Sequence, residues 1–311
     1  MTTKPTSRAD EATAAYVKRV ADWIADQIET GAADPDDWSA PWHHVTDPAG
    51  LMPYNPATGA HFTGGNRWGL WVVAMMSGLP GHWATYKQWQ TIGATVRKGE
   101  HAAARALRPL SRTWEDDDGE RHTRTIGFAS YPVFSAGQVD GYDLPATNTP
   151  PAPEHEPDAA ADIADAYTWA ATIGVRIVES PTAGASYSPT LDHVTVPDRD
   201  RWHSADGAWS TIAHECTHWT GHESRLARKF GRRFGDDAYA VEELVAELGA
   251  ATVLAMRGRH SEPRPDHAQY LAHWLRVLRE TPSALFTAAA GAERAAQYLA
   301  DRAIAVGTVA A

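Results

Sequence analysis

The segment that most constrains the fold is His-Glu-Cys-Thr-His at residues 214–218. On a helix, residues four positions apart share a face, so His214 and His218 can direct both imidazoles at one metal ion. Glu215 lies between them, where the general base of a zinc hydrolase is expected. The segment therefore predicts a helix that carries two metal ligands, with the third ligand supplied by another helix.

The next helix is expected to begin at residue 236 or 237 and to run to about residue 256. Apolar residues recur on one face at helical spacing, and a different face carries Glu243 and Glu247 among small residues. We assign Glu243 as the third ligand. Glu247, one turn further on, is expected to accept a hydrogen bond from a ligating imidazole and so to fix its tautomer. Glu242 points about a quarter-turn away and is the weaker candidate.

Two imidazoles and a carboxylate favour Zn²⁺, although Mn²⁺, Co²⁺ and Ni²⁺ accept the same donors. A fourth coordination position left to water is typical of a catalytic site rather than a structural one. His222 is an alternative ligand of lower rank, because Gly221 is expected to end the first helix before it. Tyr187 and His193 flank a predicted hairpin turn, and either can be an oxyanion donor or an ordinary hairpin residue.

Composition sets limits on the class of protein. A chain of 311 residues with 43% hydrophobic residues suits two domains with packed cores. The single cysteine, Cys216, excludes a disulfide framework, fits a cytoplasmic location and is expected to act as a small buried hydrophobe. The N-terminus lacks the apolar region of a secretory signal, and no apolar run approaches the length of a membrane span, so we expect no membrane partner.

Charge is distributed unevenly along the chain. The net charge of −11 argues against a general affinity for nucleic acid, but residues 51–112 hold seven basic residues against one acidic residue, Glu100. Tryptophans and tyrosines are interleaved with these cations. Cations that follow phosphates and rings that stack on bases suit single-stranded nucleic acid, whereas a single tryptophan more often fills a core.

The order of expected elements predicts an α+β protein of two domains, at residues 10–140 and 158–305, joined by a Pro-rich linker at 141–157. The polar residues 114–122 are expected at an exposed hairpin tip, and residues 32–65 in loops and turns. Beside the two helices already described, helices are expected at 10–30, 66–77, 86–92, 158–173, 266–279 and 283–304. Strands are expected at 101–110, 124–135 and 175–179, with a hairpin at 186–197. Residues 94–100 are expected to form a strand that leads to a turn at Lys98 and Gly99.

Two sets of motifs resemble those of one protein family. The segments Asn55-Pro-Ala-Thr-Gly, Phe62-Thr-Gly-Gly-Asn, Trp83-Ala-Thr-Tyr-Lys-Gln and Gly93-Ala-Thr-Val-Arg-Lys-Gly-Glu resemble the single-stranded-DNA-binding domain of ArdC-type antirestriction proteins, which also begins plasmid TraC-type primases. Residues 214–222 and 239–247 are similar to the zincin-like metallopeptidase domain of the same proteins. The resemblance covers about residues 15–300 in the family's own domain order.

The resemblance implies an accessory protein of mobile genetic elements, which binds single-stranded DNA and protects incoming DNA from host restriction. It implies a gluzincin-like centre in which His214, His218 and Glu243 hold the metal and Glu215 is the base. The residues that it places on the DNA side are Asn66, Arg67, Trp83, Tyr86, Lys87, Arg97 and Lys98.

Three functions are therefore open at this point. The first is an antirestriction-type protein that binds single-stranded DNA and also carries a zinc metallopeptidase acting on a protein substrate. The second is a single-stranded-DNA-binding module in which the metal site serves structure or regulation and no peptide is cut. The third is a plain metalloprotease whose N-terminal domain recognises protein.

Overall fold

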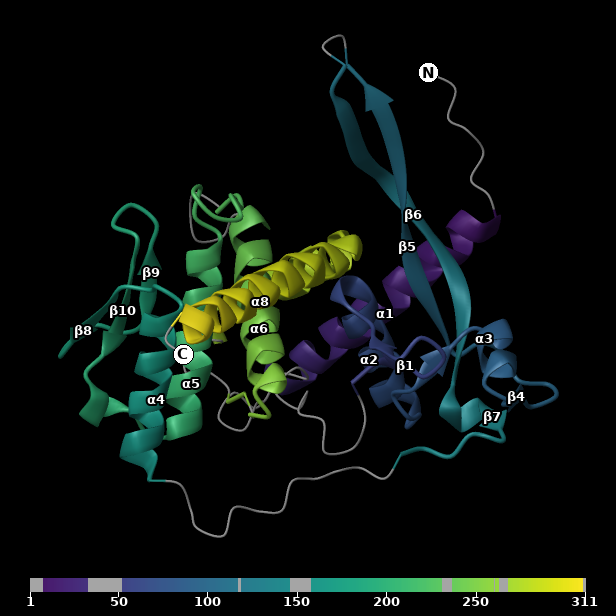
Figure 1. Cartoon of the computed structure of the whole chain (residues 1–311), viewed down its shortest axis with the longest axis horizontal. Helices are drawn as coiled ribbons and strands as arrows, with labels where there is room; N and C mark the ends of the chain where they lie inside the picture. The colour runs from purple at the N-terminus through teal and green to yellow at the C-terminus, as the bar shows by residue number, and fades with distance from the viewer. Residues whose placement is uncertain are drawn as a thin grey trace. The chain divides into compact units, whose positions relative to one another are not determined.

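The computed structural model describes residues 8–32, 52–116, 119–145, 158–230, 237–259, 261–262 and 268–309 (Figure 1). The Cα positions divide the chain into two compact units. The first unit comprises Met1–Ala21 and Gly50–Ala146, and the second comprises Asp22–Ala49 and Thr147–Ala311. Helices and strands occur in both units, so the predicted α+β class and two-domain architecture are confirmed.

The first unit combines small antiparallel sheets with short helices. Strand pairs are β1 with β2 and β4 with β7, and a three-stranded sheet has the order β3-β6-β5. Its elements are the first part of α1 (Arg8–Ala32), β1 (Tyr54–Asn55), β2 (Ala60–His61), α2 (Gly64–Ser77), β3 (Trp83–Ala84), α3 (Tyr86–Thr91), β4 (Thr95–Val96), β5 (Ala104–Glu115), β6 (Arg121–Ser135) and β7 (Val139–Asp140). The predicted helices at 10–30, 66–77 and 86–92 are thus confirmed, with small shifts at their ends.

Tryptophans fill the interior of the first unit. Trp68, Trp71, Trp83 and Trp89 are all fully buried, and the indole N–H of Trp89 donates to the carbonyl of Phe134 at 3.0 Å. Burial of rings this large is a main source of stability in a small domain. These four side chains are therefore core residues of the unit.

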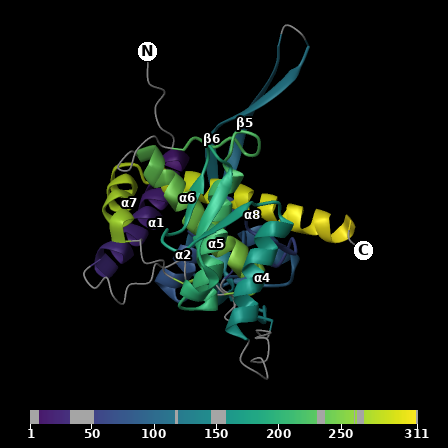
Figure 2. The same ribbon diagram turned by 90° about the vertical axis from the view of Figure 1, so that its left-hand side faces the viewer.

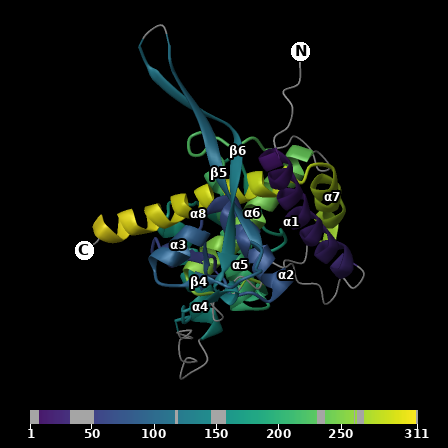
Figure 3. The same cartoon turned by 90° about the vertical axis from the view of Figure 1, so that its right-hand side faces the viewer.

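The hairpin of β5 and β6 extends from this core. Its pairing runs from Ala104 opposite Val133 to Glu115 opposite Arg121, with a register irregularity at Leu110 and Ser111. The residues from 108 to 115 are all exposed, and the outer part of the ribbon projects from its own unit (Figures 1 and 3). The strands therefore continue into both ends of the segment at 114–122 that was predicted to form only the tip.

The second unit packs helices against one small sheet. In this sheet β10 lies between β8, which is parallel to it, and β9, which is antiparallel, so β9 is an edge strand (Figure 2). The elements are α4 (Ala159–Thr172), β8 (Ile177–Ser180), β9 (Ser186–Ser188), β10 (His193–Pro197), α5 (Ala205–Thr220), α6 (Asp237–Met256), α7 (Ala268–Glu280) and α8 (Ser283–Val309). The helices, strand and hairpin predicted for this half are all present.

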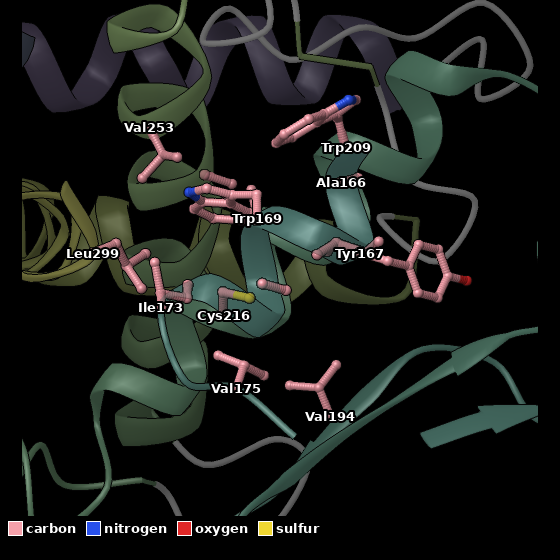
Figure 4. Close-up of a cluster of buried hydrophobic side chains, with 14 of the residues drawn as sticks. Ala166, Tyr167, Trp169, Ile173, Val175, Val194, Trp209, Cys216, Val253 and Leu299 are labelled. Atoms are coloured by element: carbon pink, nitrogen blue, oxygen red, sulfur yellow. The ribbon is translucent and has the colours of Figure 1, made fainter. Parts of the chain in front are cut away.

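Figure 4 shows the core that supports the helix with the two histidines. Trp169 of α4, Ile173 directly after that helix, Trp209 and Cys216 of α5, and Val194 of β10 belong to one buried cluster. Cys216 is fully buried and has a raised pKa, because burial disfavours the thiolate. The prediction that this cysteine acts as a small hydrophobe is confirmed.

The helices α5 and α6 approach closely at Gly249. A Cβ atom added there would lie 2.5 Å from Cγ2 of Thr217. We expect Gly249→Ala to destabilise the protein by about 1–3 kcal/mol, the usual cost of overpacking a tight core. Chemical denaturation measures this, with Gly184→Ala as a control, since a Cβ at Gly184 meets nothing within 4 Å. Equal stability of the two variants would contradict this close packing.

Some predicted features differ from the structure or lie outside the described residues. Strands β1 and β2 fall within the segment at 32–65 that was expected to form only loops, of which residues 33–51 are not described. Residues 146–157 of the predicted linker are also outside the described ranges. The second part of α1 groups with the second unit, where Arg279 of α7 pairs with its acidic side chains. None of the described helices has both the length and the apolar character needed to cross a bilayer.

Candidate metal centre

Helix α5 brings the two histidines together. It begins after Ser204, whose hydroxyl accepts from the backbone N–H of Gly207 at 2.9 Å, and it ends at Gly221, as predicted. His214 and His218 are one turn apart on the same face, and their Nε2 atoms lie 3.1 Å from each other. Both imidazoles are buried, with relative exposures of 1% and 8%.

Glu243 of α6 completes a triangle of donor atoms. Its Oε2 lies 3.5 Å from Nε2 of His214, and its Oε1 lies 3.5 Å from Nε2 of His218. Ligands at about 2.0–2.1 Å from a tetrahedral zinc ion are separated by about 3.3–3.4 Å. The three separations, 3.1, 3.5 and 3.5 Å, are close to this value, so these residues fit a divalent ion.

Each histidine also has a carboxylate beside its second ring nitrogen. Oε1 of Glu247 lies 2.8 Å from Nδ1 of His214, and Oε1 of Glu242 lies 3.2 Å from Nδ1 of His218. Such contacts orient a metal-binding imidazole and favour the tautomer with Nε2 free to bind. The sequence pointed to Glu247 for this kind of contact. It considered Glu242 only as a weaker ligand candidate and missed its position behind His218.

Arg228 is the other residue that sequence reasoning missed. It lies in the segment after α5, and its guanidinium donates to the Glu242 carboxylate at 2.8 and 3.0 Å. It also donates to the carbonyl of Thr217 and the hydroxyl of Thr220, both at 2.7 Å. Arg228 therefore ties Glu242 to the last turn of α5. Its only sequence signal is a cation shortly after a helix that carries metal ligands.

The electrostatics of the centre favour a positive charge between the carboxylates. Burial opposes protonation of His218, but Glu243 and Glu242 outweigh it and raise the pKa of His218 to about 10. Burial would raise the pKa of Glu243, but the two histidines lower it far below its ordinary value. The pKa of Glu242 is lowered too, against burial, by hydrogen bonds from His218 and Arg228. A divalent cation can supply the positive charge in place of the imidazole proton.

Glu215 lies between the two histidines in sequence and is also buried, with a relative exposure of 3%. A buried carboxylate on the helix that carries the ligands suits proton transfer, because bulk water does not compete with the reacting water for its oxygen atoms. Its place in α5 is the one that the motif predicts for a general base.

A polar network borders the centre at the hairpin of β9 and β10. The Tyr187 hydroxyl donates to Asp192 at 2.9 Å, and Arg225 donates to both residues. The ring of Phe230 lies 6.0 Å from that of Tyr187 and 6.2 Å from that of His218, measured between centroids. The Tyr187 hydroxyl is thus engaged by Asp192 and Arg225. Among the described residues, the triangle of donors contains neither His193 nor His222.

The seven residues proposed for the DNA side fall into two groups. Trp83 and Arg67 are buried, and the Asn66 side chain bonds both the N–H and the carbonyl of Leu107. There is no exposed face of Trp83 on which a base can stack. The exposed candidates are Tyr86, Lys87, Arg97 and Lys98, of which Arg97 is held by Glu100 and by backbone carbonyls.

The second unit has the features of a zincin-like metallopeptidase domain: an edge strand, a helix with two histidines and a second helix with a glutamate. A family model described as a zincin-like metallopeptidase matches residues 164–291. A second model, described as the N-terminal domain of anti-restriction factor ArdC, matches residues 14–134.

Individual relatives extend over nearly the whole chain. The uncharacterized protein y4eC of Sinorhizobium fredii (strain NBRC 101917 / NGR234) is 36% identical over 304 residues, which is 94% of each chain. The DNA primase TraC of Escherichia coli is 31% identical over 90% of this chain, which spans only 19% of the primase.

Solved structures agree with these sequence matches. The metal-free crystal structure of the antirestriction protein ArdC from plasmid R388 has a TM-score of 0.70 and 31% identity, over 93% of this chain and 98% of that one. The Mn(II)-bound structure of the same protein has a TM-score of 0.68 and 32% identity, over 92% and 97%. The chain belongs to the ArdC family of antirestriction proteins.

Proposed function

We propose that this protein binds single-stranded DNA of mobile genetic elements and carries a metal-dependent peptidase site of the gluzincin type. Under this proposal its domains are residues 10–140 and 158–305, joined by a linker at 141–157, and it acts in the cytoplasm. The observation that carries the peptidase half is the buried triangle of His214, His218 and Glu243, with separations of 3.1 to 3.5 Å.

In the proposed site His214, His218 and Glu243 hold the metal, and Glu247 and Glu242 orient the two imidazoles. A bound divalent ion supplies Lewis-acid polarisation of a carbonyl and lowers the pKa of water. Glu215 accepts the proton of the attacking water and delivers it to the leaving amine. The edge strand β9 (Ser186–Ser188) offers backbone groups with which an extended peptide can pair.

The test of this role is Glu215→Gln. We expect it to reduce the cleavage of unfolded casein by about 100-fold or more, because general base catalysis typically contributes about 100- to 10,000-fold. The metal content of the purified variant stays that of the wild type, since the three ligands are unchanged. Undiminished proteolysis by this variant would refute the assigned role of Glu215.

Zinc is the proposed native metal because the donor set and the spacing of the triangle suit a tetrahedral ion. The R388 relative has an Mn(II)-bound crystal structure, so manganese is the principal alternative. Metal analysis of protein purified without added metal separates the two. Bound manganese together with far less than one zinc ion per protein molecule would overturn the assignment to zinc.

The proposed DNA-binding half rests on the family and on exposed cations in the first unit. Tyr86, Lys87 and Lys98 are exposed, while Asn66, Arg67 and Trp83 act by shaping the surface from within. Titration of the full chain with labelled single-stranded and duplex oligonucleotides tests this half, and the proposal requires tighter binding of the single strand.

A second candidate is a metal site that stabilises or regulates the protein without cutting a peptide. The observation in its favour is that the buried donors come from two core helices, α5 and α6, so that a bound ion would link these helices and stabilise the fold. Here chelation would lower the thermal stability, and no cleavage of casein or of the protein itself would be seen with Zn²⁺ or Mn²⁺ present.

A further inference from the structure

The β5–β6 hairpin separates its charges by position. In sequence, the two strands outside the tip hold five arginines and no acidic residue, while residues 115–120 hold five acidic residues. The arginines are Arg105, Arg108, Arg112, Arg121 and Arg124. If these charges served only to prevent edge-to-edge aggregation of the ribbon, basic and acidic residues would not need to occupy separate segments, because charges of either sign prevent it.

Two arginines and a tryptophan of β5 lie on one face of the exposed part of the hairpin. Side chains alternate along β5, so Arg108, Arg112 and Trp114 share a face. Trp114 lies opposite His122, and the two rings stack with centroids 5.5 Å apart. Trp114 is itself exposed, and it lies about 7 Å along the strand from Arg112. This face therefore presents two cations followed by a flat aromatic surface.

The cross-strand register supplies basic residues from both strands. Arg112 of β5 is paired with Arg124 of β6, and Glu115 at the end of the same hairpin is paired with Arg121. Arginines on both strands outside the acidic tip suit an anionic ligand.

The guanidinium groups of Arg108 and Arg112 are available to such a ligand. Within the part of the chain that the structure describes, the side chains of Arg108 and Arg112 make no ion pair or hydrogen bond. Arg105, nearer the core, is by contrast bonded to the hydroxyl and the carbonyl of Ser130. The arginine near the core therefore bonds to the neighbouring strand, whereas the two arginines further out on β5 are exposed.

We propose that this face of the β5–β6 hairpin binds single-stranded DNA, with Arg108 and Arg112 on phosphates and Trp114 stacked on a base. Cations that track the backbone beside an aromatic ring are the usual recognition device for unpaired strands. The acidic residues of the tip repel phosphates, so the binding surface ends before the tip. The inference rests on the proposed function, and it makes the hairpin the main binding surface, with the exposed residues at α3 and β4 contributing less.

The test uses the full chain and a fluorescein-labelled oligodeoxythymidylate of about 20 nucleotides. We expect Arg108→Gln/Arg112→Gln to weaken binding about tenfold at moderate salt and to lower the slope of log affinity against log salt by about 1.4. Arg108→Lys/Arg112→Lys is expected to stay within about twofold of wild type, because both charges remain. Trp114→Ala is expected to weaken binding about tenfold through lost stacking.

Two control variants decide where the binding surface lies. Arg176→Gln/Arg294→Gln makes the same change in net charge at exposed sites of the second unit, and it should bind as wild type does. Lys87→Gln/Lys98→Gln alters the other proposed surface. If this variant loses binding while Arg108→Gln/Arg112→Gln keeps it, the hairpin inference is wrong and the proposed function stands.

The remaining outcomes are also decisive. A wild-type protein that binds no single strand, even at low salt, removes the proposed function and the hairpin inference together. Tighter binding of a duplex of equal length through the same two arginines overturns the assignment to single strands. The thermal midpoints of the two arginine double variants should stay close to that of the wild type, since both side chains are exposed.

Discussion

Replacing Glu243 by alanine is expected to abolish tight metal binding. The carboxylate bridges the two imidazoles at 3.5 Å on each side, and its loss leaves two protein ligands. Loss of a residue that only orients a ligand typically costs about 10- to 100-fold in affinity, so loss of the ligand itself should cost more than about 100-fold. Competition against a chelator of known affinity measures the effect for Zn²⁺ and for Mn²⁺.

The matched control is Glu247→Gln, one turn further along the same helix. Oε1 of Glu247 lies 2.8 Å from Nδ1 of His214, on the side of the ring away from Nε2, so this variant should lose only about 10- to 100-fold. The metal-induced rise in thermal midpoint should follow the same order, because at a fixed metal concentration the stabilisation grows with the logarithm of the ratio of that concentration to Kd. Wild-type affinity in Glu243→Ala would exclude the triangle as the metal centre.

The sequence could predict the metal helix because its determinants are local. His214 and His218 share a face by helical geometry alone, and Gly221 ends the helix as its residue type suggests. The face that carries Glu243 was also predictable, since small residues flank the carboxylates. No local rule gives the approach of α5 to α6, which depends on the missing side chain of Gly249 next to Thr217.

Two other features depended on tertiary structure in the same way. Glu242 seemed to point away from the site, but the packing of α6 brings it to Nδ1 of His218. Trp83 lies in a motif with exposed cations, yet the sheet buries it completely. Aromatic residues interleaved with basic ones do not reveal which face of a strand they occupy. The length of the β5–β6 ribbon was underestimated because its polar tip also forms ladder pairs.

Removing the carboxylate of Glu242 is expected to destabilise the whole metallopeptidase domain. Glu242→Ala leaves the guanidinium of Arg228 buried without its counter-charge, since the two groups are 2.8 Å apart and mostly hidden from solvent. Breaking such a buried pair from one side typically costs about 3–5 kcal/mol. Chemical denaturation should give this loss in the free energy of unfolding. Metal affinity should fall about 10- to 100-fold as well, because His218 loses the partner at Nδ1.

A double-mutant cycle separates the pair from its surroundings. Arg228→Ala alone leaves Glu242 without its cation, whereas the double variant leaves no unpaired charge, so its loss should be smaller than the sum of the two single losses by about 0.5–3 kcal/mol. Glu223→Ala, at an exposed position of the same segment, is the control and should stay within about 0.5 kcal/mol of wild type. Strictly additive losses would mean that Arg228 and Glu242 act independently. Arg228 would then stabilise the last turn of α5 only through Thr217 and Thr220, and His218 would owe its orientation to Glu242 alone.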